Sequence, residues 1–249
     1  MVEIKSDKQI EKMKHAGSIL AECHKALSKM VLPGITTLEL DQFVERFLHE
    51  RGAKPAQKGY MGYPFATCSS VNNEVCHGLP NRKPLKNGDI LTVDFVVDHD
   101  GWLADSAWSY EVGKIAPEAQ RLMKATRKAL YKGIEQAQVG NRLGDIGNAI
   151  ESYADRKGYS IVREFIGHGI GRNIHEEPQV HHIGERNTGI KLKEGMVITI
   201  EPIFNEGLPY ITMGSDGWTA LTYDGSLSVQ YEHTVAITRN GPIILTEQA

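Results

Sequence analysis

The sequence predicts an α+β fold built from two similar halves, each supplying two helices and a strand that bears a carboxylate. One observation is a strand–turn–strand pattern from Asp89 to Ser109 that contains two aspartates. A second is that an offset of 106 residues aligns 34–52 with 140–158 without a gap, and an offset of 107 aligns LKNGDILTVD with LKEGMVITIE. The repeat predicts pseudo-twofold symmetry, with a site at the seam between the halves.

The bulk composition excludes several classes of protein and names no partner. The chain has 249 residues, of which 41% are hydrophobic and 24% charged, with a formal net charge of -3. The sequence has no concentration of basic residues that would indicate nucleic-acid specificity. The polar N-terminus lacks a signal-peptide core, and no run approaches the roughly 20 apolar residues of a membrane span, so we expect a cytoplasmic protein without membrane contact. Three cysteines without CxxC spacing argue against a disulfide framework.

Apolar residues at helical spacing predict four helices. They run from Ser6 to about Met30, from Thr36 or Thr37 to Gly52, from Pro117 to about Gln138, and from just after Gly140 to Gly158. Residues 60–80 read as an irregular loop in which a site could form. The segment 113–117 is too short for a linker, so we expect residues 1–249 to form a single domain.

The aspartate hairpin is the centre of the pattern. Strands are expected over 90–97 and 102–110, with the turn formers of 98–101 between them. If Val97 faces Trp102, Asp94 lies directly opposite Asp105, about 5 Å away between Cβ atoms. A cation between the carboxylates would relieve their repulsion. The alternatives are that one aspartate is protonated, or that a register shifted by one residue separates them.

The second half adds further polar residues in apolar surroundings. His168 and His175 lie in FIGHGIGRNIHEEP, Glu201 ends the strand of ITIEP, and Glu232 lies in the alternating strand SVQYEHTVAIT that begins at Ser228. Each could be a satisfied polar residue without a function. Together with the aspartates they form an oxygen-rich set with one imidazole, which is typical of paired divalent metals.

These residues resemble those of the type I methionine aminopeptidases, metallopeptidases with the pita-bread fold. The resemblance covers essentially the whole chain through YMGYPFATCSSVNNEVCHG, VDF with ADS eleven residues on, GHGIGRNIHEEP, ITIEP and QYEHT. It implies a central antiparallel-rich sheet flanked by helices. No zinc-finger extension precedes the motifs, as in the short bacterial form.

The resemblance implies that two divalent ions are held by Asp94, Asp105, His168, Glu201 and Glu232. Asp94 would bind one ion with both oxygens, Asp105 and Glu232 would bridge, and His168 and Glu201 would complete the other site. The ions would lower the pKa of a bridging water, whose hydroxide attacks the first peptide bond. The ligand chemistry admits Mn, Fe, Co or Zn.

The same resemblance assigns catalytic roles to His77, His175 and Glu201. His175 would donate to the oxyanion, His77 would contact the scissile nitrogen, and Glu201 would transfer a proton. A methionine pocket is expected from Tyr60, Tyr63, Cys68 and Trp218, beside the two histidines. Ile174 departs from the pattern, because the family commonly has an aromatic residue there.

The implied function is removal of the N-terminal methionine from nascent polypeptides with a small second residue, by a monomer in transient contact with the ribosome. Two alternatives differ from it. One is a proline-directed aminopeptidase or dipeptidase of the same fold, although such proteins usually carry an extra N-terminal domain. The other is a catalytically inactive relative kept as a binding module, against which the intact set of ligand positions argues.

Overall fold

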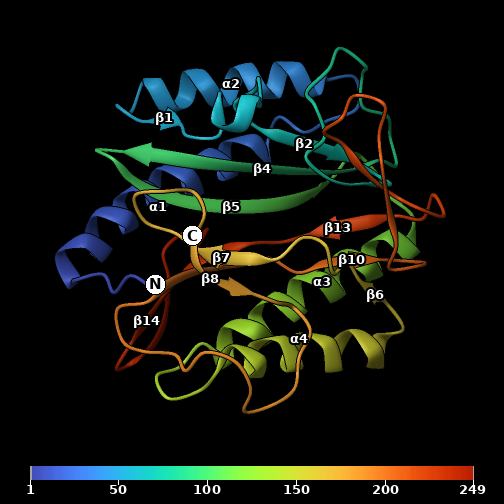
Figure 1. Ribbon diagram of the computed structural model, residues 1–249. Helices are drawn as coiled ribbons and strands as arrows, with labels where there is room; N and C mark the ends of the chain where they lie inside the picture. Colours follow the sequence, from blue (N-terminus) through green and yellow to red (C-terminus); the bar gives the residue numbers. More distant parts are fainter. Residues whose placement is uncertain (1, 249) are drawn as a thin grey trace.

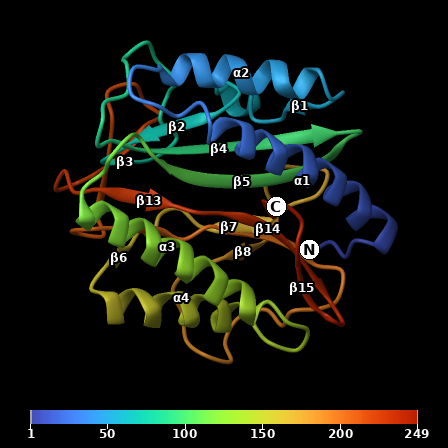
Figure 2. The same ribbon diagram turned by 180° about the vertical axis from the view of Figure 1, so that it is seen from behind.

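A computed structural model describes residues 2–248 of the chain. Two pairs of helices enclose the strands, as Figures 1 and 2 show from opposite sides. The helices are α1 (Asp7–Leu27), α2 (Thr37–His49), α3 (Pro117–Gln136) and α4 (Leu143–Lys157), and a 3-10 turn η1 covers Tyr60–Gly62. All four helices were predicted from apolar spacing. No helix within residues 2–248 is long and apolar enough to cross a membrane.

The strands pair antiparallel throughout and divide into four sheets. The first contains β1 (Lys54–Pro55), β2 (Cys68–Val71), β4 (Ile90–His99) and β5 (Trp102–Glu111). The second contains β6 (Ser160–Ile161), β10 (Ile203–Asn205) and β13 (Ser228–Gln230), and the third β3 (Glu74–Cys76), β11 (Ile211–Met213) and β12 (Ala220–Thr222). The fourth contains β7 (Gly167–Gly169), β8 (Glu176–Val180), β9 (Val197–Ile200), β14 (His233–Thr238) and β15 (Gly241–Ile244).

Each half has its own hydrophobic core. Helix α1 packs on β4 and β5, and α2 packs on α1 and β1, around residues such as Leu20, Leu48 and Phe95, all fully buried. Helices α3 and α4 pack on the second-half strands around Ile146, Phe204 and neighbouring aliphatic side chains. The helices therefore lie on the outer sides of both halves, and the strands meet at the seam (Figure 1).

The predicted hairpin forms, but the predicted register is wrong. His99 rather than Val97 pairs with Trp102, because the turn is reduced to Asp100 and Gly101, both with positive φ angles of 54° and 71°. Such a two-residue turn matches the twist of antiparallel strands. The tighter turn moves the register by two, so Asp94 pairs with Ala107 and Asp105 with Val96. The two aspartates share a face as diagonal neighbours instead of standing directly opposite.

The internal repeat is visible in equivalent turns before α2 and α4. The φ angles of Gly34 and Gly140 are 100° and 99°. Isolated bridges join Thr36 to Pro84 in the first half and Arg142 to Lys191 in the second, at offsets of 106 and 107 residues. Both offsets found in the sequence therefore correspond to the same contact made twice, which supports the pseudo-twofold relation.

Two further expectations about strands need correction. The region 60–80, expected to be irregular, contains the short strands β2 and β3. The strand expected from Ser228 onward is interrupted at Tyr231 and Glu232, between β13 and β14. Glu201 lies at a similar interruption between β9 and β10. Alternation of apolar residues continues across these breaks, so it could not reveal them.

Candidate active site

A cavity of about 540 Å³ opens at the seam between the two halves. It is lined by all of the predicted ligand positions, Asp94, Asp105, His168, Glu201 and Glu232, and by His77 and His175. The first two come from the hairpin of the first half, and the other three come from three different strands or strand ends of the second. Folding thus brings together residues that are as far apart in sequence as 94 and 232.

The imidazole of His168 is oriented as a lone-pair donor. Its Nδ1 lies 2.9 Å from the carbonyl oxygen of Gly169 and can only donate to it, which leaves Nε2 as the unprotonated nitrogen. Burial, followed by the nearby His175, lowers the pKa of His168 to about 4, so the ring is neutral. Its Nε2 lies 3.8 Å from Asp105 Oδ2 and 3.7 Å from Glu201 Oε1. A cation between them would be attracted by both the lone pair and the carboxylate oxygens.

The carboxylates show the same deficit of positive charge. Ligand atoms of Asp105, His168 and Glu232 all lie within 4.8 Å of one another. Asp105 Oδ1 and Glu232 Oε1 are buried and have no hydrogen-bond partner among residues 2–248. Burial is the main cause that raises the pKa of all four carboxyl groups, to about 7 for Asp105 and about 8 for Glu201. These residues fit divalent metal ions, which would supply the missing charge.

Glu201 is held by side chains that the sequence analysis did not single out. Thr199 Oγ donates to Glu201 Oε1 at 2.7 Å, and it also accepts from the backbone N–H of His168 at 3.0 Å. Gln230 Nε2 lies 3.4 Å from Glu201 Oε2, and the backbone N–H of Glu201 donates to His182 Nε2 at 3.1 Å. Thr199 and Gln230 each precede a glutamate by two residues, so they share its face of the chain. That spacing was the signal that could have revealed them.

The two other histidines stand at the mouth of the cavity. Tyr60 Oη and His175 Nδ1 are 3.0 Å apart, and the ring centroids of His175 and His168 are 4.4 Å apart. His77 has a positive φ of 56° and packs edge-on against Phe165 with centroids 5.2 Å apart. Burial lowers the pKa of both histidines, and for His77 the nearby His175 lowers it further. Both rings are therefore neutral near pH 7 and can each donate one hydrogen bond.

A smaller pocket of about 140 Å³ adjoins the cavity and shares Asp94, Asp105, His77 and His175 with it. The predicted methionine-pocket residues Tyr60, Tyr63, Cys68 and Trp218 all line it, together with Gln57, Met61, Val96 and Ile174. The Tyr63 and Trp218 rings meet edge-on at 5.1 Å. Burial raises the pKa of the Cys68 thiol well above its usual range, so it stays uncharged. The walls suit an uncharged, polarizable side chain.

Comparison with known proteins identifies relatives over the full length. Residues 11–239 match metallopeptidase family M24. A methionine aminopeptidase of Clostridium perfringens is 47% identical over 246 residues, which cover 99% of both chains. The crystal structure of methionine aminopeptidase from Rickettsia prowazekii superposes with a TM-score of 0.98 at 44% identity, covering 99% of this chain and 100% of that one.

A more distant structure shares the fold with a different activity in its name. Prolidase from Pyrococcus furiosus has a TM-score of 0.79 and 25% identity, and the match covers 99% of this chain but only 66% of the prolidase. About a third of the prolidase chain lies outside the match.

Proposed function

The chain belongs to metallopeptidase family M24, and from that premise we propose that it hydrolyses the first peptide bond of polypeptides that begin with methionine. The observation that carries the proposal is the apolar pocket beside the carboxylate cluster. A side chain in the pocket of Tyr63, Cys68 and Trp218 places the adjoining carbonyl group near His77 and His175. Full-length relatives at 44% and 47% identity that are named methionine aminopeptidases support this substrate.

Family membership implies divalent metal ions, and we propose that two of them are held by Asp94, Asp105, His168, Glu201 and Glu232. The orphaned oxygens of Asp105 and Glu232 and the lone pair of His168 support this set. Four ionised carboxylates carry four negative charges. Two divalent ions would neutralise all four charges, whereas one divalent ion would neutralise only two. When bound, the ions supply Lewis-acid chemistry and lower the pKa of a water. Mn, Fe, Co and Zn all suit these ligands.

The chain's own residues carry the proton and charge movements. His175 accepts from Tyr60 at Nδ1 and donates from Nε2 to the carbonyl oxygen as negative charge develops there. Glu201 takes a proton from the attacking water, whose oxygen bonds to the carbonyl carbon. His77 holds the scissile nitrogen, and that nitrogen receives the proton as the C–N bond breaks. The products are free methionine and a peptide shortened by one residue.

The proposal extends to the setting of the reaction. Nascent polypeptides emerge in the cytoplasm, where we place the enzyme, acting as a monomer and in transient contact with the ribosome. The residue after methionine would be small, because the space beside the pocket is bounded by His77 and His175, which line both the pocket and the cavity. Ile174 forms part of the pocket wall where relatives commonly have an aromatic ring, so this wall is less bulky.

A peptide series tests the proposal. Protein purified without added metal would be assayed on Met-Ala, Met-Leu and Ala-Pro peptides after reconstitution with each of the four metals. We expect release of methionine from the Met-Ala peptide, much slower release from Met-Leu and no cleavage of Ala-Pro. Preferred cleavage of Ala-Pro would assign the chain to the proline-directed enzymes. Metal binding without any cleavage would assign it to the inactive binding relatives.

A further inference from the structure

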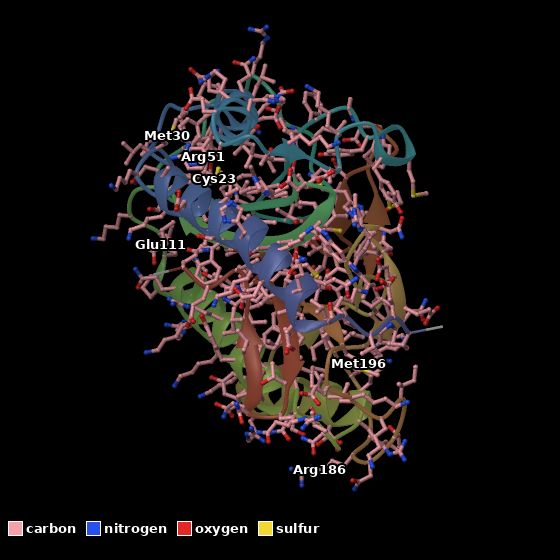
Figure 3. All side chains as sticks on the ribbon, turned by 90° about the vertical axis from the view of Figure 1, so that its left-hand side faces the viewer. Cys23, Met30, Arg51, Glu111, Arg186 and Met196 are labelled. Carbon is pink, nitrogen blue, oxygen red and sulfur yellow. The ribbon has the colours of Figure 1, made fainter. Side chains whose placement is uncertain are left out.

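The segment before α1 is fixed to the second half of the molecule. Figure 3 shows it in blue as it leaves the start of α1 close to the labelled Met196. The backbone N–H of Lys5 donates to the carbonyl oxygen of Gly195 at 2.7 Å. A Cβ atom on Gly195 would lie 2.6 Å from the Lys5 carbonyl oxygen, so glycine is needed for this approach.

The side chain of Lys5 is buried, although it is a lysine in the first six residues of the chain. Its ammonium group forms an ion pair with Glu176 Oε2, and only 1% of the Lys5 side chain and 8% of the Glu176 side chain are exposed. Gly171 makes room for it, because a Cβ there would lie 2.5 Å from Lys5 Cε. Two glycines thus accommodate a single lysine.

Glu176 uses its second oxygen to close the loop between β7 and β8. Oε1 accepts from the backbone N–H of Arg172 at 2.9 Å and of Asn173 at 3.1 Å. The loop is also held at its start, where the backbone N–H of Leu103 donates to the Gly171 carbonyl oxygen at 2.9 Å. One carboxylate therefore connects the buried lysine to the backbone of residues 172 and 173.

This loop presents His175 to the cavity. His175 directly precedes Glu176 and contacts Tyr60 and the ring of His168. Within residues 2–248, the side chain of His175 forms no hydrogen bond with Lys5. Removing the ammonium group would leave the Glu176 carboxylate buried without its counterion, which favours a rearrangement of the loop. Catalysis would tolerate little movement of the loop, because misplacing a catalytic group by 1 Å can lower the rate about a hundredfold.

We propose that Lys5 is a positioning residue that holds His175 in its working orientation through Glu176 and the 171–176 loop. The proposal rests on the proposed function, in which His175 donates to the carbonyl oxygen. Lys5 precedes the residues 11–239 that match the family, so its contribution comes from a part of the chain beyond that match. The N-terminal segment of one half thereby controls a residue of the other half.

The test compares Lys5→Met with the wild type on a Met-Ala peptide in the metal-loaded enzyme. We expect kcat to fall about tenfold, less than a full 1 Å displacement would cost, with KM and bound metal unchanged. Glu176→Gln, which retains an acceptor for the loop backbone, should reproduce the loss if Lys5→Met folds poorly. Lys8→Met is the matched control, because Lys8 is exposed and makes no ion pair among the described residues. It should leave kcat unchanged.

A double-mutant cycle with His175→Ala separates positioning from general destabilisation. If Lys5 acts through His175, adding Lys5→Met to His175→Ala should have almost no further effect. The change in kcat should stay below about twofold, which is the usual scatter in the sum of two independent effects. A full tenfold loss in that background, or unchanged kcat in Lys5→Met alone, would overturn the proposal. Loss of metal in parallel with activity would also overturn it. Inactivity of the wild type would instead refute the proposed function.

Discussion

The two halves of the molecule deliver their carboxylates to the same cavity by different means. In the first half, Asp94 and Asp105 stand within two ten-residue strands that pair without interruption. In the second half, Glu201 and Glu232 occupy breaks between short strands. The turns before α2 and α4 remain equivalent. The comparison teaches that duplication preserved the framework, while the strands next to the site diverged.

This difference has a physical consequence for each half. A continuous hairpin fixes Asp94 and Asp105 through the register of the ladder, and Thr234 of the second half adds hydrogen bonds to the backbone of Asp105. Glu201 has no such ladder at its own position and is held by the hydrogen bonds from Thr199 and Gln230 instead. We therefore expect both halves to be needed for metal binding and catalysis, but for different structural reasons.

The largest expected effect comes from removing one ligand in either half. Asp94→Asn and Glu232→Gln should each reduce turnover by more than about a hundredfold and lower the bound metal, because each removes a charge that a divalent ion requires. The change from oxygen to nitrogen preserves shape, so the fold should persist. Metal analysis, circular dichroism and an activity assay check this. Full activity in one of the two variants would show that its half is dispensable.

Removing His175 should have the next largest effect. His175→Ala should lower kcat by about a hundredfold, the usual loss for one oxyanion donor, with the metals retained. The ligand variants lose metal and activity together, so elemental analysis beside kinetics distinguishes the two roles. If His175→Ala lost metal as fully as Asp94→Asn, the assignment of separate roles would be wrong.

The buried carboxyl groups that the two halves bring together predict an unusual pH dependence of the stability of the metal-free protein. Burial raises the pKa of Asp105 to about 7, and burial with the nearby Asp105 raises that of Glu201 to about 8. Between about pH 7.5 and 8.5, where the histidines of the unfolded chain are already neutral, the folded chain therefore holds more protons than the unfolded chain, in which carboxyl groups titrate near about 4. Stability must fall as pH rises through this window, by about 1 to 2 kcal/mol.

Below that window the effect is masked. Burial lowers the pKa of His24 to about 4 and of His182 and His233 to about 3, so the unfolded chain takes up more protons there and opposes the trend. Thermal unfolding at about pH 7.5 and about pH 8.5 checks the prediction. The fall in Tm should be roughly 2–8 °C without metal and should disappear with metal. A metal-free protein whose Tm rises with pH would contradict it.

The smallest expected effect tests the equivalence of the framework. Gly34 and Gly140 have the same positive φ, and a Cβ atom at either would meet nothing within 4 Å. Alanine at each position should therefore cost only backbone strain, about 1 kcal/mol, and leave kcat unchanged. Chemical denaturation of Gly34→Ala and Gly140→Ala measures both costs. Markedly unequal values would show that the two turns are no longer equivalent.

The sequence was most informative where structure depends on local patterns. Apolar spacing and caps located all four helices, and repeated glycines revealed the duplication, because these signals act over a few residues. The hairpin was predicted with its register wrong by two residues, since the turn type of Asp100 and Gly101 decides it. The break at Glu232 was missed because apolar alternation continues through it.

The site was predictable to a similar extent. The positions that the resemblance assigns to metal ligands, catalytic histidines and the pocket lie together around two adjoining cavities, and their roles stay predictions. Thr199, Gln230 and Lys5 were not found. Their importance depends on which distant group they contact, such as Glu201 or Glu176, and a sequence alone does not give such contacts.

The most direct test of the account is the number of divalent ions bound when activity is complete. Metal-depleted protein would be dialysed against increasing Mn²⁺, with bound metal and methionine release measured in the same samples. We predict no activity without metal and full activity as occupancy approaches two ions per chain. Full activity in the metal-depleted protein would contradict the account. So would unchanged metal binding in the Asp94→Asn variant, because the ions would then be bound outside this cavity.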